Sequence, residues 1–176
     1  MKKNLFLVFF VAVCKAAYYQ SVNIPYTLQF KGADGASVNS GKSYLYVSPS
    51  NGNLRADGVL PSQENTDYAH YEWYFIPVEG EEPGWYYVKN GTGKFLYNSG
   101  SVIKVGEPSE EDSPTWRFFK VQNDMSGEQE YTFRMVQNVK DKACHMIRSG
   151  NTFITTSNSF TTGNTTVSVK PSGEYS

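Results

Sequence analysis

The sequence predicts an all-β chain built from three similar units of four strands. Helical periodicity is nearly absent, and short alternating runs bounded by Gly, Asn, Ser and Pro recur about every ten residues. Three of these runs end in a leucine-type residue followed by a Ser/Gly/Asn turn, and these residues (Leu45, Leu96 and Met146) are 51 and 50 positions apart. An internal period of this size is typical of folds made from repeated supersecondary units.

Each unit divides into four expected strands. In chain order the expected ranges are 26–30, 44–47, 53–56 and 72–78, then 85–89, 94–97, 102–105 and 116–121, then 131–136, 143–147, 152–156 and 166–170. The last strand of each unit carries two alternating residues that we expect to face inward, namely Trp73/Phe75, Trp116/Phe118 and Val167/Val169. The first unit is longer than the others, and we place its extra residues in a polar surface loop at 57–71.

The linkers at 79–84 and 123–127 are too short to join independent domains. We therefore expect one shared core in a single domain at 24–172, with units at about 24–79, 84–122 and 129–171 and a tail at 173–176.

The first residues have the pattern of a secretory signal peptide. Lys2 and Lys3 form a basic region, an unbroken apolar run covers 5–13, and Cys14 and Ala16 are the small residues of a cleavage site. The run is shorter than the roughly 20 apolar residues of a membrane span. We expect residues 1–16 to be removed and the protein to be secreted, with acylation of Cys14 as a lipid anchor as the alternative.

The net charge of the mature chain argues against one class of binding partner. Removing Lys2, Lys3 and Lys15 takes the basic residues from 16 to 13 against 17 acidic ones, so the mature chain carries about −4. Nucleic acid is not the expected partner, because binding to phosphates needs a basic surface.

Cleavage after Ala16 leaves Cys144 without a partner for a disulfide, so stability must come from packing, for which 13 Tyr, 11 Phe and 3 Trp are available.

The second unit carries a family resemblance. It reads Tyr86-Tyr87-Val88-Lys89-Asn90-Gly91-Thr92-Gly93-Lys94-Phe95-Leu96, followed by Pro114-Thr115-Trp116-Arg117-Phe118. This pattern is similar to the repeat of ricin-B-type lectins, in which a Tyr-x-Ile-x-Asn strand, a Thr-Gly-Lys turn and a Leu precede a terminal Trp-x-Phe. The resemblance implies a β-trefoil of three four-strand repeats, and it extends as a weaker pattern over residues 26–171.

The lectin signature is degenerate in this chain. The family's Gln-x-Trp motif is replaced by Tyr71-Glu72-Trp73 and Pro114-Thr115-Trp116. The family also places an Asp just before the second strand, where it accepts hydrogen bonds from two sugar hydroxyls. Asp141 sits near that place, while Gly41 and Thr92 occupy it in the other units. The resemblance therefore favours the third unit as the one that keeps a sugar pocket.

A sugar site needs an aromatic face for the C–H side of the ring and carboxylate or amide groups for the hydroxyls. The candidate residues lie at the turns of the three units: Asn51, Asn53, Asp57, Tyr97, Asn98, Asp141, His145, Arg148 and Asn151. The alternative is that Asn and Asp in tight turns serve only backbone geometry through Asx-type hydrogen bonds.

Other chemistry has weaker support in the sequence. Cys144 and His145 are neighbours, and neighbouring residues on a strand face opposite sides, so they do not form a thiolate dyad. The two histidines, His70 and His145, match no zinc-ligand spacing, and no His-Glu-x-x-His or Gly-x-Ser-x-Gly motif occurs. We expect a non-enzymatic protein without metal or cofactor. Asn90 and Asn164 begin N-glycosylation triplets.

These observations predict a secreted protein that binds glycans on glycoproteins or cell surfaces. The glycans should be neutral, because the acidic clusters at 79–82 and 107–112 would repel anionic chains. One alternative is a β-trefoil protease inhibitor that acts through the loop at 57–70 or the loop at 107–114. Another is a surface or coat protein that binds other proteins.

Overall fold

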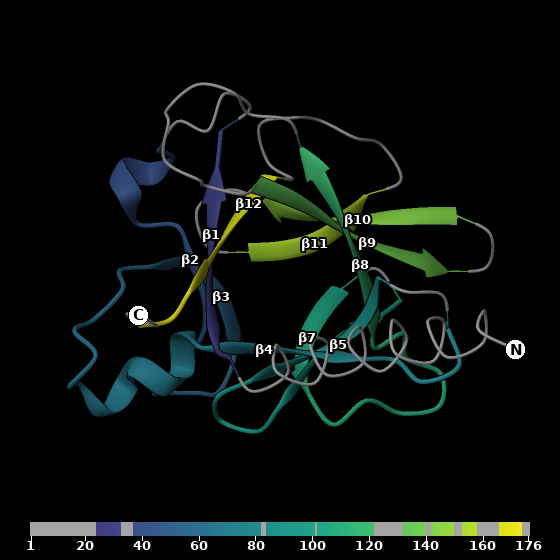
Figure 1. Cartoon of the computed structure of the whole chain (residues 1–176), viewed down its shortest axis with the longest axis horizontal. Helices are drawn as coiled ribbons and strands as arrows, with labels where there is room; N and C mark the ends of the chain where they lie inside the picture. Colours follow the sequence, from purple (N-terminus) through teal and green to yellow (C-terminus); the bar gives the residue numbers. More distant parts are fainter. Residues whose placement is uncertain are drawn as a thin grey trace, which may run out of the picture.

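The computed structural model describes residues 24–32, 37–81, 84–100, 102–121, 132–139, 142–149, 153–157 and 166–173. This part of the chain is all-β, with two short 3₁₀ helices (Figure 1). In the first third of the chain the elements are β1 (Tyr26–Lys31), η1 (Asn39–Gly41), β2 (Tyr44–Val47), β3 (Leu54–Gly58), η2 (Thr66–Tyr71) and β4 (Trp73–Pro77). The remaining strands are β5 (Trp85–Asn90), β6 (Phe95–Ser99), β7 (Val102–Gly106), β8 (Thr115–Val121), β9 (Thr132–Val139), β10 (Lys142–Ser149), β11 (Phe153–Ser157) and β12 (Thr166–Pro171).

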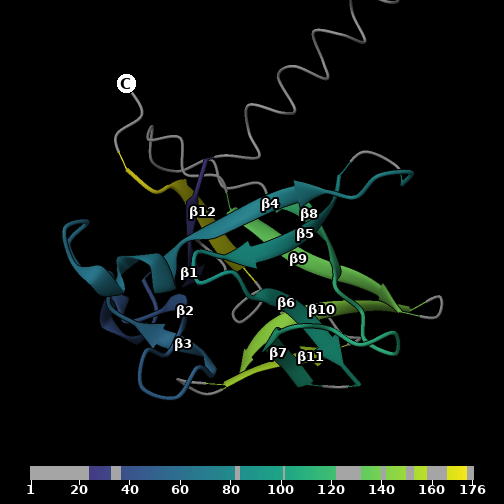
Figure 2. The ribbon, with the colours of Figure 1, turned by 90° about the horizontal axis from the view of Figure 1, so that it is seen from below.

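Six of the strands pair into a closed antiparallel ring. β1 pairs with β4, β4 with β5, β5 with β8, β8 with β9, β9 with β12, and β12 returns to β1. The other six form the hairpins β2–β3, β6–β7 and β10–β11, which join the ring through β1, β5 and β9. In Figure 2, β6, β7, β10 and β11 lie together on one side of the molecule, away from β4 and β5. The same pairing scheme thus recurs three times along the described part of the chain.

The expected strand ranges agree with the observed ones to within about three residues. The loop expected at 57–71 was partly wrong, because Asp57 and Gly58 end β3, and the 3₁₀ helix η2 begins at Thr66. This helix is held by its flanking residues: the side chain of Asn65 accepts a hydrogen bond from the backbone N–H of Asp67. Tyr68 and Tyr71 turn inward from η2 and are buried, which anchors it to the sheet.

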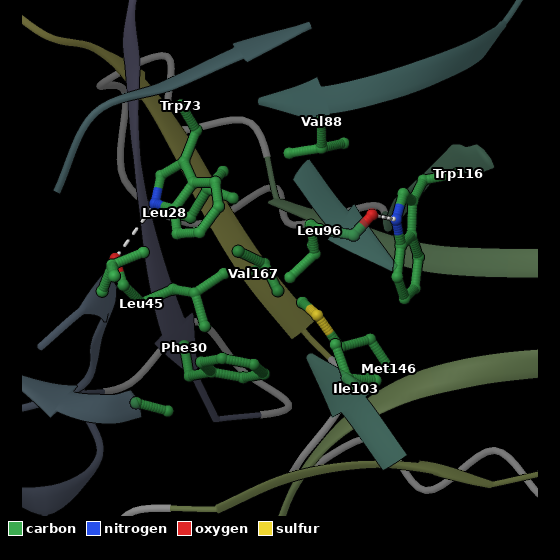
Figure 3. Close-up of a cluster of buried hydrophobic side chains, with 12 residues drawn as sticks. Leu28, Phe30, Leu45, Trp73, Val88, Leu96, Ile103, Trp116, Met146 and Val167 are labelled. Atoms are coloured by element: carbon green, nitrogen blue, oxygen red, sulfur yellow. Dashed lines mark hydrogen bonds between the residues drawn. The ribbon is translucent and has the colours of Figure 1, made fainter. Parts of the chain in front are cut away.

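The core is one cluster of side chains drawn from all three units (Figure 3). Leu45, Leu96 and Met146, the residues that set the sequence period, are each fully buried in it. Of the residues expected to face inward, Trp73, Trp116 and Val167 are fully buried, and Phe75 and Val169 pack against the cluster from its edge. The side chain of Phe118 lies outside the described part.

The two buried tryptophans make the same hydrogen bond in successive units. Trp73 Nε1 donates to the carbonyl oxygen of Leu45 over 3.0 Å, and Trp116 Nε1 donates to that of Leu96 over 2.9 Å (Figure 3). Each bond satisfies an indole N–H that would otherwise be buried without a partner. The last strand of a unit is thereby fixed to the second strand of the same unit.

Candidate functional site

Among the described residues, a polar cluster with well-defined side-chain hydrogen bonds is centred on β3. Arg55 and Asp57 are two residues apart, so they share one face of the strand, while Ala56 between them points into the core and is fully buried. Arg55 Nε donates to Asp57 Oδ1 over 2.9 Å and a terminal guanidinium nitrogen donates to Oδ2 over 2.6 Å. Arg55 and Asp57 thus form a bidentate ion pair, which fixes both side chains in one orientation.

Two tyrosines complete the cluster. Tyr46 of β2 lies directly opposite Arg55, and its hydroxyl donates to Asp57 Oδ1 over 3.4 Å. Its ring stacks on Tyr71 of η2, with centroids 4.7 Å apart and planes 3° from parallel. We call Tyr46, Arg55, Asp57 and Tyr71 the Asp57 cluster.

Gly58 makes room for the stacked rings. A Cβ at this position would lie 2.6 Å from Tyr71, 2.8 Å from Tyr46 and 2.9 Å from the carbonyl oxygen of Tyr44. No other residue fits without moving one of these atoms, so the glycine allows both rings to close over the end of β3. Its role here is close approach of side chains rather than backbone freedom.

The electrostatics of the cluster follow from these contacts. Hydrogen bonding from Arg55 lowers the pKa of Asp57, so the carboxylate stays ionised at neutral pH. Burial raises the pKa of Tyr71 to about 12, and burial together with the Asp57 charge raises that of Tyr46. Both phenols are therefore neutral hydrogen-bonding groups at physiological pH.

The cluster presents chemistry suited to a hydroxyl-rich ligand. The side chains of Arg55 and Asp57 are 36% and 23% exposed, so solvent reaches both. An ionised carboxylate has about four acceptor positions and a guanidinium has five N–H donors, so their mutual bonds leave capacity for a ligand. Because the two charges offset each other, the arrangement favours a neutral ligand over an ion.

The other two first-unit candidates, Asn51 and Asn53, have a local structural role. The backbone N–H of Asn53 donates to Asn51 Oδ1 over 3.0 Å, and the carbonyl of Asn53 accepts from the N–H of Ser48 over 2.8 Å. This is the Asx-type turn that was the alternative explanation for asparagines at these positions. Asn51 is thus committed to the turn that leads into β3.

The second-unit candidates do not converge on one face. Asn98 is 3% exposed and lies opposite Ile103 of β7, and its backbone exchanges two hydrogen bonds with Ser113. Tyr97 is the next residue along β6, so its side chain leaves the opposite face of the strand. The two residues therefore do not form one pocket.

In the third unit, His145 and Arg148 both lie on β10, opposite Ser157 and Ile154 of β11. Their side chains, and the whole of Asp141, Asn151 and Asn164, lie outside the described residues. The third-unit pocket and the Asn164 glycosylation triplet thus stay predictions.

Asn90 has a structural role in the folded chain. It is 1% exposed, and its Nδ2 donates to the carbonyl oxygens of His70 and Glu72, each over 3.0 Å. Its Oδ1 accepts from the backbone N–H and the hydroxyl of Thr92. A glycan on Nδ2 would replace one of the two hydrogens that hold η2 against β5. In this packing the amide of Asn90 is used for structure, and its glycosylation stays a prediction.

The sequence reasoning singled out Asp57 but missed three members of its cluster. The signal for Arg55 was available, since opposite charges two residues apart on a strand share a face. Tyr46 and Tyr71 had no such signal, because their stacking depends on where η2 docks.

In the described residues, no group of three or more His, Cys, Asp or Glu side chains is placed to hold a metal ion.

Comparison with solved structures supports the fold class. The chain is similar to the protein in the crystal structure of Cry35Ab1, with a TM-score of 0.53 and 12% sequence identity over 88% of this chain and 37% of that one. At this identity the likeness shows an all-β fold and nothing about activity. The chain therefore spans 37% of the length of the Cry35Ab1 chain. No protein-family model and no curated protein matches the sequence.

The described part of the chain also contains no helix with the length and apolar character needed to cross a membrane.

Proposed function

We propose that this chain is a secreted, non-enzymatic carbohydrate-binding protein with a β-trefoil fold, working without metal or cofactor. The trefoil assignment is supported by the threefold recurrence of the strand pairing and by the fully buried Leu45, Leu96 and Met146. The signal-peptide pattern at 1–16 supports export. Under this proposal residues 24–172 form the binding domain.

One observation carries the functional proposal: the Asp57 carboxylate is ionised, partly exposed and fixed by Arg55 beside the hydroxyl of Tyr46. Each sugar hydroxyl can donate one hydrogen bond and accept others, so two adjacent hydroxyls match a carboxylate that accepts and a guanidinium that donates side by side. Pre-organisation reduces the entropy lost when a ligand binds. We expect a single terminal neutral sugar to occupy this site, with Tyr46 at its edge.

A glycan array probed with the purified chain and with Asp57→Asn tests the proposal. The substitution keeps the shape and removes the charge, so glycans bound by the parent should be lost from the variant. Asp112→Asn is the matched control, because Asp112 is also a hydrogen-bonded carboxylate but lies in the loop before β8. An array with no bound glycan, or equal binding by the parent and Asp57→Asn, would contradict the site.

Protease inhibition is a second candidate function, favoured by one feature. Val59, directly after β3, is 60% exposed, and residues 62–67 are all exposed as well. An exposed apolar side chain on a surface loop is the geometry by which an inhibitor enters a protease cleft. A protease panel distinguishes the two functions, because inhibition should depend on Val59 and not on Asp57.

A further inference from the structure

Three asparagines in the described part of the chain close the same kind of turn. The side-chain oxygen of each accepts the backbone N–H of the residue two positions on, in the pairs Asn51 with Asn53 over 3.0 Å, Asn65 with Asp67 over 2.9 Å, and Asn90 with Thr92 over 3.1 Å. This bond polarises the side-chain carbonyl, so its carbon, Cγ, becomes a better target for a nucleophile. A five-membered ring forms when the backbone nitrogen of the following residue attacks this carbon.

The residue after each asparagine decides whether this attack is sterically open. The three pairs are Asn51-Gly52, Asn65-Thr66 and Asn90-Gly91. The β-branched side chain of a threonine crowds its own backbone nitrogen, and a glycine has no side chain to do so. The first and the third turn therefore permit the attack, and the second hinders it.

Burial closes the Asn90 turn to this reaction. Asn90 is 1% exposed, and its Nδ2 donates to the carbonyl oxygens of His70 and Glu72. Gly91 packs so closely on η2 that a Cβ there would collide with the carbonyl oxygen of Ala69. The side-chain amide of Asn90 cannot move toward the next nitrogen without breaking these contacts.

The turn at Asn51 is open to solvent. Asn51 is exposed, and the backbone N–H of Gly52 donates to the carbonyl oxygen of Ser48 over 2.8 Å. Hydrogen bonds in exposed turns open far more often than those in a packed core. A Cβ on Gly52 would lie 3.0 Å from Lys94 Nζ, so an ammonium group stands beside this backbone. Its positive charge favours the loss of a proton from the Gly52 nitrogen and the formation of a carboxylate nearby.

We propose that Asn51 is a site of spontaneous deamidation in the folded chain, and that the fold protects Asn90 from the same reaction. The backbone nitrogen of Gly52 attacks Asn51 Cγ and gives its proton to solvent, while Nδ2 takes up a proton and leaves as ammonia. The product is a cyclic imide. Water opens the ring at Cγ to give aspartate, or at the backbone carbonyl to give isoaspartate, so water is the only other reactant.

Both products change the β2–β3 turn. Each adds a negative charge close to Lys94. Isoaspartate also routes the main chain through Cγ, which lengthens it by one methylene and shifts Asn53 relative to Ser48, whose N–H the carbonyl of Asn53 accepts over 2.8 Å. Because this turn leads into β3, the reaction makes an irreversible chemical change at the start of that strand. Deamidation here does not depend on the proposed binding of sugars.

Peptide mapping by mass spectrometry tests the proposal, because trypsin places the three asparagines in separate peptides, residues 43–55, 56–89 and 90–94. The full chain is incubated at mildly alkaline pH, either folded or unfolded in urea. In the folded chain we expect Asn51 to convert roughly tenfold or more faster than Asn90 and Asn65. In urea, Asn51 and Asn90 should convert at rates within about threefold of each other, because unfolding removes the burial.

Variants in the same turn supply the controls. Asn51→Gln keeps an amide, but its extra methylene disfavours ring closure, so the modification at this position should disappear. Asn53→Gln leaves the Asn51-Gly52 pair intact, and its Asn51 should convert within about threefold of the parental rate. Circular dichroism shows that each chain stays folded during the incubation. Two results would overturn the proposal: an Asn51 that remains an amide in the folded chain while it converts in urea, or an Asn90 or Asn65 that converts as fast as Asn51 in the folded chain.

Discussion

Trp116 Nε1 donates to the carbonyl oxygen of Leu96 over 2.9 Å and repeats the bond between Trp73 and Leu45 in the unit before it. In the third unit Val167 occupies the corresponding place on the last strand and is fully buried. A valine side chain carries no N–H, so it cannot make this bond to the carbonyl oxygen of Met146. An indole thus occupies this place on β4 and β8, and a buried valine occupies it on β12.

Truncating Trp116 should be costly. Trp116→Ala removes a fully buried indole and should lower the free energy of unfolding by about 3–5 kcal/mol. Trp116→Phe keeps most of the apolar volume but leaves the carbonyl of Leu96 without its donor, so it should cost about 1–3 kcal/mol. Urea denaturation followed by circular dichroism measures both. A loss below 1 kcal/mol for the alanine variant would contradict a core role for this indole.

Replacing Asn90 should loosen η2. Asn90→Ala removes one donor from each of two backbone carbonyls, those of His70 and Glu72, and should lower the unfolding free energy by about 2–4 kcal/mol. Thr92→Ala removes a single hydroxyl from the same network and should cost about 1 kcal/mol. Thermal denaturation of both variants against the parent gives the comparison. Equal melting temperatures for Asn90→Ala and the parent would show that η2 is held by other contacts.

Gly58→Ala should disturb the Asp57 cluster directly. The new Cβ would approach Tyr71 and Tyr46 to less than 3 Å, so the two rings must separate. We expect a destabilisation of about 1–3 kcal/mol from overpacking together with weaker sugar binding. Gly100→Ala is the control, because a Cβ there meets no atom within 4 Å, although its positive φ of 70° carries its own strain. If the Gly58 variant keeps parental sugar affinity, the ring stack is not needed for the site.

The stacked tyrosines should titrate late. The pKa of Tyr71 is raised to about 12 from an ordinary value of 10.0, because burial disfavours the phenolate. Because the pKa of Tyr71 is higher in the folded than in the unfolded chain, neutral Tyr71 contributes fully to the free energy of unfolding below pH 10. This contribution is lost as the pH rises toward 12. Phenolate absorbance at increasing pH should show Tyr71 ionising after the exposed tyrosines, with unfolding in the same range. Tyr71→Phe should remove the late step.

Much of the fold was predictable from the sequence, because strand and core signals are local. Alternation in runs such as Trp73–Pro77 depends only on neighbouring residues, and the all-β fold that it predicts was confirmed. Leu45, Leu96 and Met146, singled out by their spacing in the sequence, are each fully buried. The 3₁₀ helix η2 was not predicted, since its stability comes from long-range bonds to Val47 and Asn90. His70 Nδ1 lies 2.7 Å from the carbonyl oxygen of Val47, 23 residues away in the chain.

The same difference between local and long-range signals decides which features of the candidate site could be predicted from the sequence. Asp57 was singled out from the sequence as a carboxylate in a loop, whereas it lies on β3 and is fixed by Arg55. The roles of Asn90 and Asn98 were missed, because burial of a polar side chain depends on what packs over it. No local pattern reports that an asparagine donates to two carbonyls from a different unit.

The proposed role of Asp57, as an ionised carboxylate that binds a neutral sugar, predicts how the affinity for an array-identified glycan changes with pH. Hydrogen bonding from Arg55 lowers the pKa of Asp57 below its ordinary value of 3.8. Affinity should therefore stay constant from pH 7 down to about 4 and fall only as the pH passes below that value. Asp57→Asn should lack this acid limb and bind weakly at every pH. An affinity that falls already between pH 7 and 5, or an asparagine variant that binds like the parent, would contradict this role of Asp57.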